Sequence, residues 1–197
     1  MTNGIQAVAD STGHEFREVL SSVDAMMKQF GINGETALKI IQDGFVAGAD
    51  DSGQFLDMLK QYQGSFNDIG VSANELTAII AQTRSGIFNE EGMAAIQMAG
   101  KNIRNMSKST KESLAAIGIS ADQMIAKLNS GQMTTMQAIQ QISGALKKVP
   151  AQAQETGAVL QDVFGKKGAK AGYELVTSLA DMSTNLDDVK SKTGEHG

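Results

Sequence analysis

The sequence has no cysteine and no tryptophan, and only one proline and two histidines occur among its 197 residues. Without cysteine the chain cannot form disulfides, thiolate metal sites or thiol nucleophiles. It also lacks an apolar run of about 18 residues, so we predict no transmembrane helix. The first residues, "MTNGIQAVADSTG", have neither a basic start nor an apolar core, and they therefore lack the pattern of a secretory signal.

The residues that are present favour helix. Alanine, glutamine, leucine and isoleucine are frequent, there are 11 methionines, and no clean period-2 run of β-branched residues occurs. The 21 glycines are expected at helix ends, joints and close helix contacts. We therefore predict an all-α fold: an irregular multi-helix bundle of successive helical hairpins joined by glycine corners, with few or no strands.

Three short stretches share one pattern: an apolar residue, a glycine, an aliphatic residue, a small polar residue and then a helix-like run. They are "FGINGETAL" from Phe30, "IGVSANEL" from Ile69 and "IGISADQM" from Ile117. In the second, Gly70 is expected to end one helix in the left-handed conformation, and Ser72 and Glu75 to form the capping box of the next. The equivalent residues are Gly31, Asn33 and Thr36 in the first stretch, and Gly118, Ser120 and Gln123 in the third. The spacings of 39 and 48 residues between the glycines are too uneven for a regular solenoid.

Further helix starts follow from the same capping chemistry. We predict them at Asp51 with Gln54, at Asn89, at Ser109 with Glu112, and at Thr134 with Gln137. Two more helices are predicted to meet at Gly165. The expected organisation is a single helical domain over residues 1–182, divisible at 11–68, 69–117 and 118–182, followed by a flexible tail over 183–197.

No pattern in the sequence predicts catalysis or ligand binding. "HEFRE" has no second histidine at the spacing of a zinc-binding helix, so His14 is expected to be a solvent-facing residue near a helix start. The glycines of "FGKKGAKAG" match no phosphate-binding loop, and we interpret them as sites of tight helix packing. The acidic "GADDSG" lacks the ordered oxygen ligands of a calcium loop. We therefore predict no catalytic, cofactor-binding or metal-binding residues, no cofactor and no enzyme.

Charge is distributed unevenly along the chain. Residues 1–98 carry 13 acidic and 5 basic residues, whereas residues 99–197 carry 9 acidic and 12 basic residues. This asymmetry could steer self-association or docking to a partner of complementary charge. The simpler interpretation is a solvated surface on which charged residues are unevenly distributed. The basic stripe over residues 101–111 is too sparse, and too poor in aromatic residues, to indicate a nucleic-acid site.

The order of these elements resembles the helical repeat region of phage tail tape measure proteins over roughly residues 30–180. The elements are the glycine-rich turn from Gly48 to Gly53, the helix with Leu59 and Tyr62, the corner from Ile69 to Glu75, and the turn from Gly86 to Asn89. Downstream, "LAAIGISADQMIAKLNSGQM" is similar to the family's next unit, and "TGAVLQDVFGKKGAKAGYEL" to the segment that ends in a Leu-Phe-Gly corner. Here that corner has valine in place of leucine, and Lys166 and Lys167 stand where acids often follow.

The resemblance implies a structural protein that occupies the lumen of the tail tube and sets its length. It also implies tail tube and tail assembly proteins as partners, with self-association as a further option, and location in the virion tail and, during assembly, in the host cytoplasm. Because such chains are usually far longer, we expect a fragment or a prophage-encoded segment. The first alternative is a helical adaptor whose methionines, Met26, Met27, Met93 and Met98, bind partner helices. A membrane-active bundle and an enzyme are less favoured.

Overall fold

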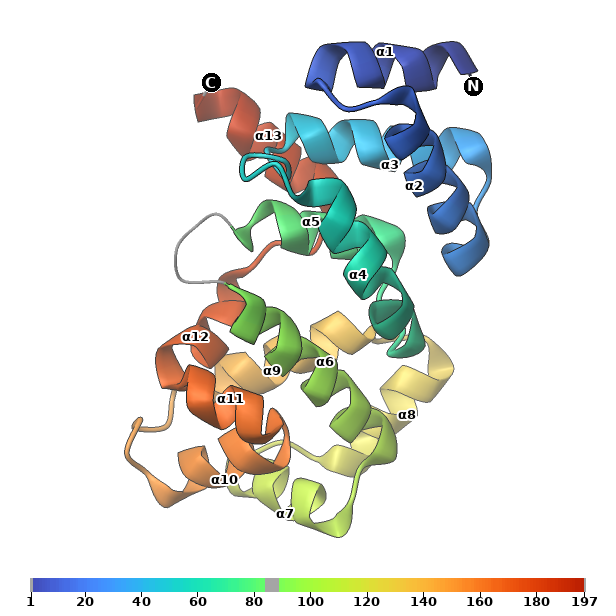
Figure 1. Cartoon of the computed structure of the whole chain (residues 1–197). Helices are drawn as coiled ribbons and strands as arrows, with labels where there is room; N and C mark the ends of the chain where they lie inside the picture. The colour runs from blue at the N-terminus through green and yellow to red at the C-terminus, as the bar shows by residue number, and fades with distance from the viewer. Residues whose placement is uncertain (1, 84–88, 197) are drawn as a thin grey trace. The chain divides into compact units, whose positions relative to one another are not determined.

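The chain folds as helices throughout the part that the structure describes, which is residues 2–83 and 89–196, with side chains up to residue 192. In this computed structural model these ranges contain α-helices and short 3-10 segments but no strand, so the predicted all-α class is confirmed (Figure 1). The contacts divide the chain into two compact units. We call residues 1–85 with 183–197 the host unit, and residues 86–182 the inserted unit. This division differs from the single domain expected over residues 1–182.

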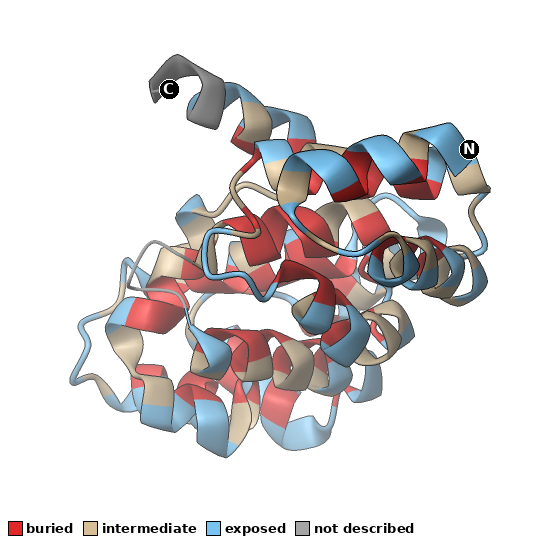
Figure 2. Ribbon diagram, turned by 45° about the horizontal axis from the view of Figure 1, so that its top comes forward, coloured by how far each residue is buried: buried red, intermediate tan, exposed pale blue. Residues whose placement is uncertain are grey.

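The host unit consists of five consecutive helices and one that returns from the far end of the sequence. They are α1 (Thr2–Thr12), α2 (Phe16–Phe30), α3 (Gly34–Val46), α4 (Phe55–Asp68), α5 (Ala73–Ala81) and α13 (Leu186–His196). Helix α2 packs against α3 and α4, while α5 packs against α3 and α4. Each helix turns its buried residues inward and its exposed residues outward (Figure 2). The interior contains Met26, Ile41, Phe55, Phe66 and Leu76, all fully buried.

Two of the three predicted corners lie in the host unit, and both have the expected chemistry. Gly31 and Gly70 adopt the left-handed conformation, with φ of 65° and 83°. Ser72 and Glu75 form both hydrogen bonds of a capping box. The predicted box of Asp51 and Gln54 is wrong, because α4 begins at Phe55 and its backbone N–H donates to Asp50 Oδ1 at 3.2 Å. The neighbouring aspartate is therefore the one that holds the helix start.

The C-terminal segment, expected to be a flexible tail, forms helix α13 and packs against α3 and α5. Leu186 is fully buried and Val189 nearly so. The apolar residues of "LDDVKS" are too few to predict burial from sequence, since only the surface supplied by α3 and α5 makes them core residues. Helix α1 was likewise not predicted, although Ile5, Val8 and Ala9 are buried against the same unit.

The inserted unit is continuous in sequence. Its elements are α6 (Glu90–Asn105), α7 (Lys108–Ala116), α8 (Ala121–Ser130), α9 (Thr135–Leu146), α10 (Gln154–Asp162), α11 (Gly165–Ala171), α12 (Tyr173–Ser178) and the 3-10 helix η2 (Leu179–Asp181). Helix α11 packs on α6 and α10, α7 packs on α10, and η2 packs on α9. The buried centre includes Met93, Ile96, Ile139, Ile142 and Phe164.

The remaining caps are confirmed with three corrections. The first is that Ser120 accepts from the backbone N–H of Gln123 at 3.3 Å without the reciprocal bond that would complete the predicted capping box. Asn89, Ser120 and Thr134 cap α6, α8 and α9 through their side chains, and Thr134 completes a capping box with Gln137. Helix α7 is capped by Ser107, which accepts from the N–H of Thr110, and not by Ser109. The last predicted helix is broken at Gly172 into α11 and α12. The predicted turn from Gly86 to Asn89 falls largely on residues 84–88, outside the described residues.

Candidate functional site

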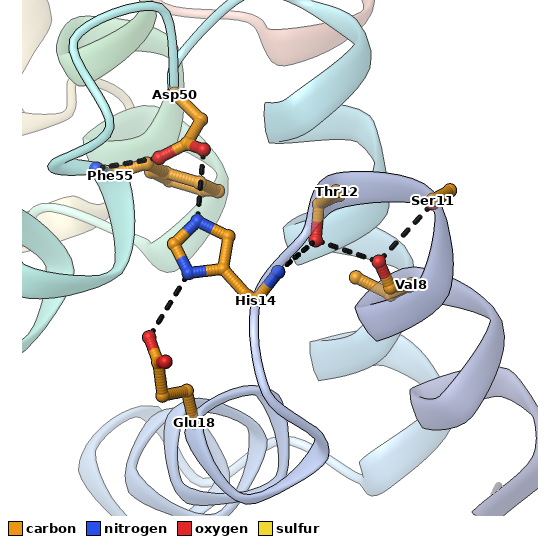
Figure 3. Close-up of polar contacts among 7 residues, drawn as sticks. All are labelled: Val8, Ser11, Thr12, His14, Glu18, Asp50 and Phe55. Atoms are coloured by element: carbon orange, nitrogen blue, oxygen red, sulfur yellow. Dashed lines mark hydrogen bonds and ion pairs between the residues drawn. The ribbon is translucent and has the colours of Figure 1, made fainter.

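His14 is the centre of the main polar cluster of the host unit (Figure 3). The residue lies in the joint between α1 and α2, and its side chain is only 16% exposed. Its Nδ1 is 3.0 Å from Glu18 Oε2, one helical turn along, and its Nε2 is 2.9 Å from Asp50 Oδ2 in the loop between α3 and α4. The imidazole also lies against the ring of Phe45, with 5.6 Å between the ring centroids. This placement corrects the solvent-facing position that we expected from the sequence.

Two carboxylates control the charge of this imidazole. Burial disfavours the charged form and by itself lowers the pKa of His14. The hydrogen bonds and attraction from Glu18 and Asp50 outweigh that effect and raise the pKa above its ordinary value. The same contact lowers the pKa of Glu18. Both nitrogens donate when the ring is protonated, so the cluster is best satisfied as an imidazolium between two carboxylates.

The cluster connects three parts of the host unit. The backbone N–H of His14 donates to Thr12 Oγ1 at 3.4 Å, which fixes the end of α1. Asp50 uses its second oxygen to hold the first N–H of α4. Since both ring nitrogens face carboxylates, the geometry is that of a structural clamp between α1, α2 and the start of α4. The signal visible in the sequence is the spacing of four residues between His14 and Glu18, whereas Asp50 is brought in by the fold.

A second polar cluster surrounds Asp162 at the end of α10 in the inserted unit. Ser109 Oγ donates to Asp162 Oδ2 at 3.0 Å, and Ser113 donates to the same oxygen. Thr110 Oγ1 donates to the backbone carbonyl of Asp162 at 3.3 Å. Ser109, predicted as a helix cap, therefore fastens α7 to α10. This cluster too is a joint between helices.

Of the three glycines of "FGKKGAKAG", for which tight helix packing is predicted, Gly165 lies in a close contact with another helix. A Cβ on Gly165 would lie 2.6 Å from Met98 Cγ of α6, and this glycine also has a φ of +71°. A Cβ on Gly168 would overlap Phe164. Gly165 therefore lets α11 lie close against α6, whereas Gly168 makes room for Phe164 at the start of its own helix, and a Cβ on Gly172 would meet nothing within 4 Å.

The methionines on which the adaptor alternative rested are not an exposed stripe. Met26 and Met93 are fully buried, and Met98 packs on Gly165. An open groove of about 510 Å³ does exist in the inserted unit, where Ile117 and Ile119 face Ala145 and Val149, with Lys148 at the rim.

Two negative observations apply to the described residues. Within residues 2–83 and 89–196, no helix combines the length and the apolar character needed to cross a membrane. Over that part of the chain, no group of three His, Asp or Glu side chains is arranged to hold a metal ion.

One comparison with known proteins gave a match. Residues 1–165 match the family model described as phage-related minor tail protein. Neither the curated proteins nor the solved structures contain a match to this chain.

Proposed function

The chain belongs to the family of phage-related minor tail proteins, and we propose that within the tail it acts as a tape measure, occupying the tube lumen and setting tube length. Membership of the family assigns it a structural role in a phage tail, with tail assembly proteins as partners. The finer proposal rests on one observation: the family match and the capped helix corners lie in the same part of the sequence. The family match over residues 1–165 covers most of the series of capped corners on which the tape measure resemblance rests.

Helical structure offers a physical basis for measuring length. An α-helix rises about 1.5 Å per residue, so a continuous helix of this chain would extend roughly 300 Å. The corners at Gly31, Gly70 and Gly118 instead fold the isolated chain into compact units. In this role the chain exchanges corner contacts for contacts with the tube. We expect X-ray scattering of the free protein to give a profile far shorter than such a rod.

The test is to change the number of residues and measure the tail. Deleting residues 108–146 in frame from the phage gene should shorten tails in electron micrographs by about 60 Å if the segment is helical in the tube. Duplicating it should lengthen them by the same amount. The control replaces the segment with an unrelated helical sequence of equal length, which should leave tail length unchanged. Tails of unaltered length after both the deletion and the duplication would refute the proposal.

A helical interaction module without catalytic activity is the second candidate, favoured by the apolar groove beside Ile117, Ile119 and Val149. This candidate predicts that the deletion abolishes tail assembly without giving shortened tails. Recovery of tail tube protein on the immobilised chain would support a place in the tail lumen. Loss of that recovery in a Val149→Asp variant would assign the contact to the groove.

A further inference from the structure

The host unit includes a helix that follows the inserted unit in sequence. Helix α13 lies across α3 and α5, where it buries Leu186 and Val189 (Figure 1). The five helices α1–α5 are consecutive and bring their own buried residues together. The surface of α3 and α5 that α13 covers is therefore a helix-binding surface, which we call the α3–α5 groove.

Polar contacts give this groove its specificity. Asn74 of α5 accepts from the backbone N–H of Leu186 at 3.1 Å, which satisfies a donor at the start of α13. Gln82 holds the incoming backbone by two hydrogen bonds, accepting from the N–H of Ser183 at 2.9 Å and donating to its carbonyl at 2.7 Å. Lys190 Nζ lies 3.2 Å from Asp43 Oδ1 on α3. The groove thus selects a helix with Leu186, Val189 and Lys190 in this register.

The order of synthesis leaves the groove empty for a time. Roughly 100 residues separate the end of α5 from the start of α13, so translation at about 5–20 residues per second takes about 5–20 s to supply the helix. In that interval any α13 with the right sequence is able to fill the groove. Another copy of the same chain presents the same helix.

We propose that the α3–α5 groove is an intermolecular site that binds α13 of a second copy, so that two chains exchange their C-terminal helices. The exchanged form keeps the contacts of Leu186, Val189 and Lys190 with α3 and α5. Its cost is that of association and of rearranging the connection over residues 182–185, which includes Ser183. This connection has no regular secondary structure, which makes it suitable as the hinge. The proposal depends on the packing of the host unit and not on any role in tail length.

Charge reversal at the Asp43–Lys190 pair distinguishes exchange from folding within one chain. Asp43→Lys places two lysines opposite each other within one chain, and Lys190→Asp places two aspartates there. When the two variants are mixed, exchange produces a dimer in which both pairs are of opposite charge. Neither variant alone is able to form a matched pair, whether within a chain or between identical copies.

The experiment refolds the two full-length variants together and measures their mass by sedimentation and native mass spectrometry. We expect a 1:1 heterodimer of twice the 20.8 kDa chain mass in the mixture, and at least tenfold less dimer for either variant alone. A mixture with no more heterodimer than the separate variants would overturn the proposal.

The double variant Asp43→Lys/Lys190→Asp is the matched control for this experiment. It keeps the repulsion that Asp43→Lys introduces toward Lys39, one turn earlier on α3, but it restores a pair of opposite charge within one chain. Refolded alone, the double variant should therefore give no more dimer than the natural sequence. An excess of dimer in this control would show that the altered charges, and not helix exchange, cause the association.

A second measurement avoids altering the ion pair. Because the chain has no cysteine, one copy labelled at Thr36→Cys on α3 and another labelled at Lys192→Cys on α13 report proximity by energy transfer. Co-refolding at high concentration should give transfer close to that of one chain carrying both labels, and dilution of pre-folded chains should give none. Transfer that stays at background after co-refolding would also overturn the proposal.

Discussion

The two units are both helical, but one is continuous in sequence and the other is not. The inserted unit is continuous over residues 86–182, whereas the host unit is built from both ends of the sequence. Their charges differ as well: the host unit has 14 acidic and 7 basic residues, and the inserted unit has 8 acidic and 10 basic residues. The host unit is fastened by ion pairs around His14 and Asp43, and the inserted unit by hydroxyl contacts to Asp162. Close packing at glycine occurs in both units, at Gly44 beside Phe55 and at Gly165 beside Met98. The comparison shows two units with different topology and charge, and we expect their stabilities to be separable.

The largest expected effect is the loss of stability when one buried phenylalanine is replaced by alanine in one unit at a time. Phe66 and Phe164 are both fully buried, one in each unit. Each Phe→Ala variant should lose about 3–5 kcal/mol in its own unit, because the cavity adds to the lost transfer free energy. Hydrogen exchange read by mass spectrometry should show reduced protection over residues 2–83 for Phe66→Ala and over 89–182 for Phe164→Ala. Equal loss over both ranges in either variant would mean that the units unfold as one.

The next effect tests whether the host unit depends on the far end of the chain. Leu186→Ala should destabilise the host unit by about 2–3 kcal/mol, because Leu186 is fully buried at the edge of the unit. Protection of amides in α3 and α5 should fall, while that of α6 and α9 should not. Asp188→Ala, an exposed change on the same helix, should shift stability by less than about 0.5 kcal/mol. If the inserted unit responds to Leu186→Ala instead, the division of the chain is wrong.

In the inserted unit, the close contact between α11 and α6 depends on Gly165. Gly165→Ala is expected to cost about 1–2 kcal/mol, since the new Cβ meets Met98 and the backbone has a positive φ. Gly157 provides the matched control, because it lies in α10 with nothing within 4 Å of an added Cβ. Gly157→Ala should stabilise the unit by about 0.5–1 kcal/mol. Thermal unfolding of the two variants should therefore shift in opposite directions.

The smallest expected effect is a pH dependence confined to the host unit. The pKa of His14 is raised on folding, so its contribution is fully present below its unfolded pKa of about 6.5 and is lost as pH rises through the raised value. The pKa of Glu18 is lowered, so its contribution is lost as pH falls below its ordinary range. The host unit should thus be most stable at about pH 5–6.5.

The inserted unit contains no histidine and is the internal reference for this pH series. His14→Gln should flatten the dependence of the host unit above about pH 6, because a glutamine carries no titrating proton. A host unit whose stability does not change between about pH 6 and 8 would show that the clamp contributes nothing to folding.

Local chemistry explains which parts of the fold were predictable from the sequence. Ser72 with Glu75 and Thr134 with Gln137 were predicted correctly because a capping box joins residues only three apart. Errors arose where two candidates lay close together. By sequence alone, Ser107 and Ser109 are both plausible caps of α7. Only the fold brings Asp162 of α10 beside Ser109, whose hydroxyl donates to it, while Ser107 caps α7.

The other misses depend on residues far apart in the chain. Asp50 reaches His14 from 36 positions away, and α13 finds its groove more than 100 residues before it in sequence. Neither contact leaves a periodic signal, because each uses one or two side chains. The division into two units is also not visible in the sequence. Capped helices follow one another on both sides of the boundary, so local patterns do not mark it.

The two hydrogen bonds between Gln82 and Ser183 have a mechanical consequence. Both ends of the chain belong to the host unit, so tension applied between them passes through α13 and its contacts with α3 and α5. The inserted unit lies outside that path while the hydrogen bonds at Gln82 hold. Stretching should therefore detach α13 first and only then put force on residues 86–182, which release roughly 350 Å of extended chain. The expected response to tension is therefore two successive extensions, the first from release of α13 and the second from unfolding of residues 86–182.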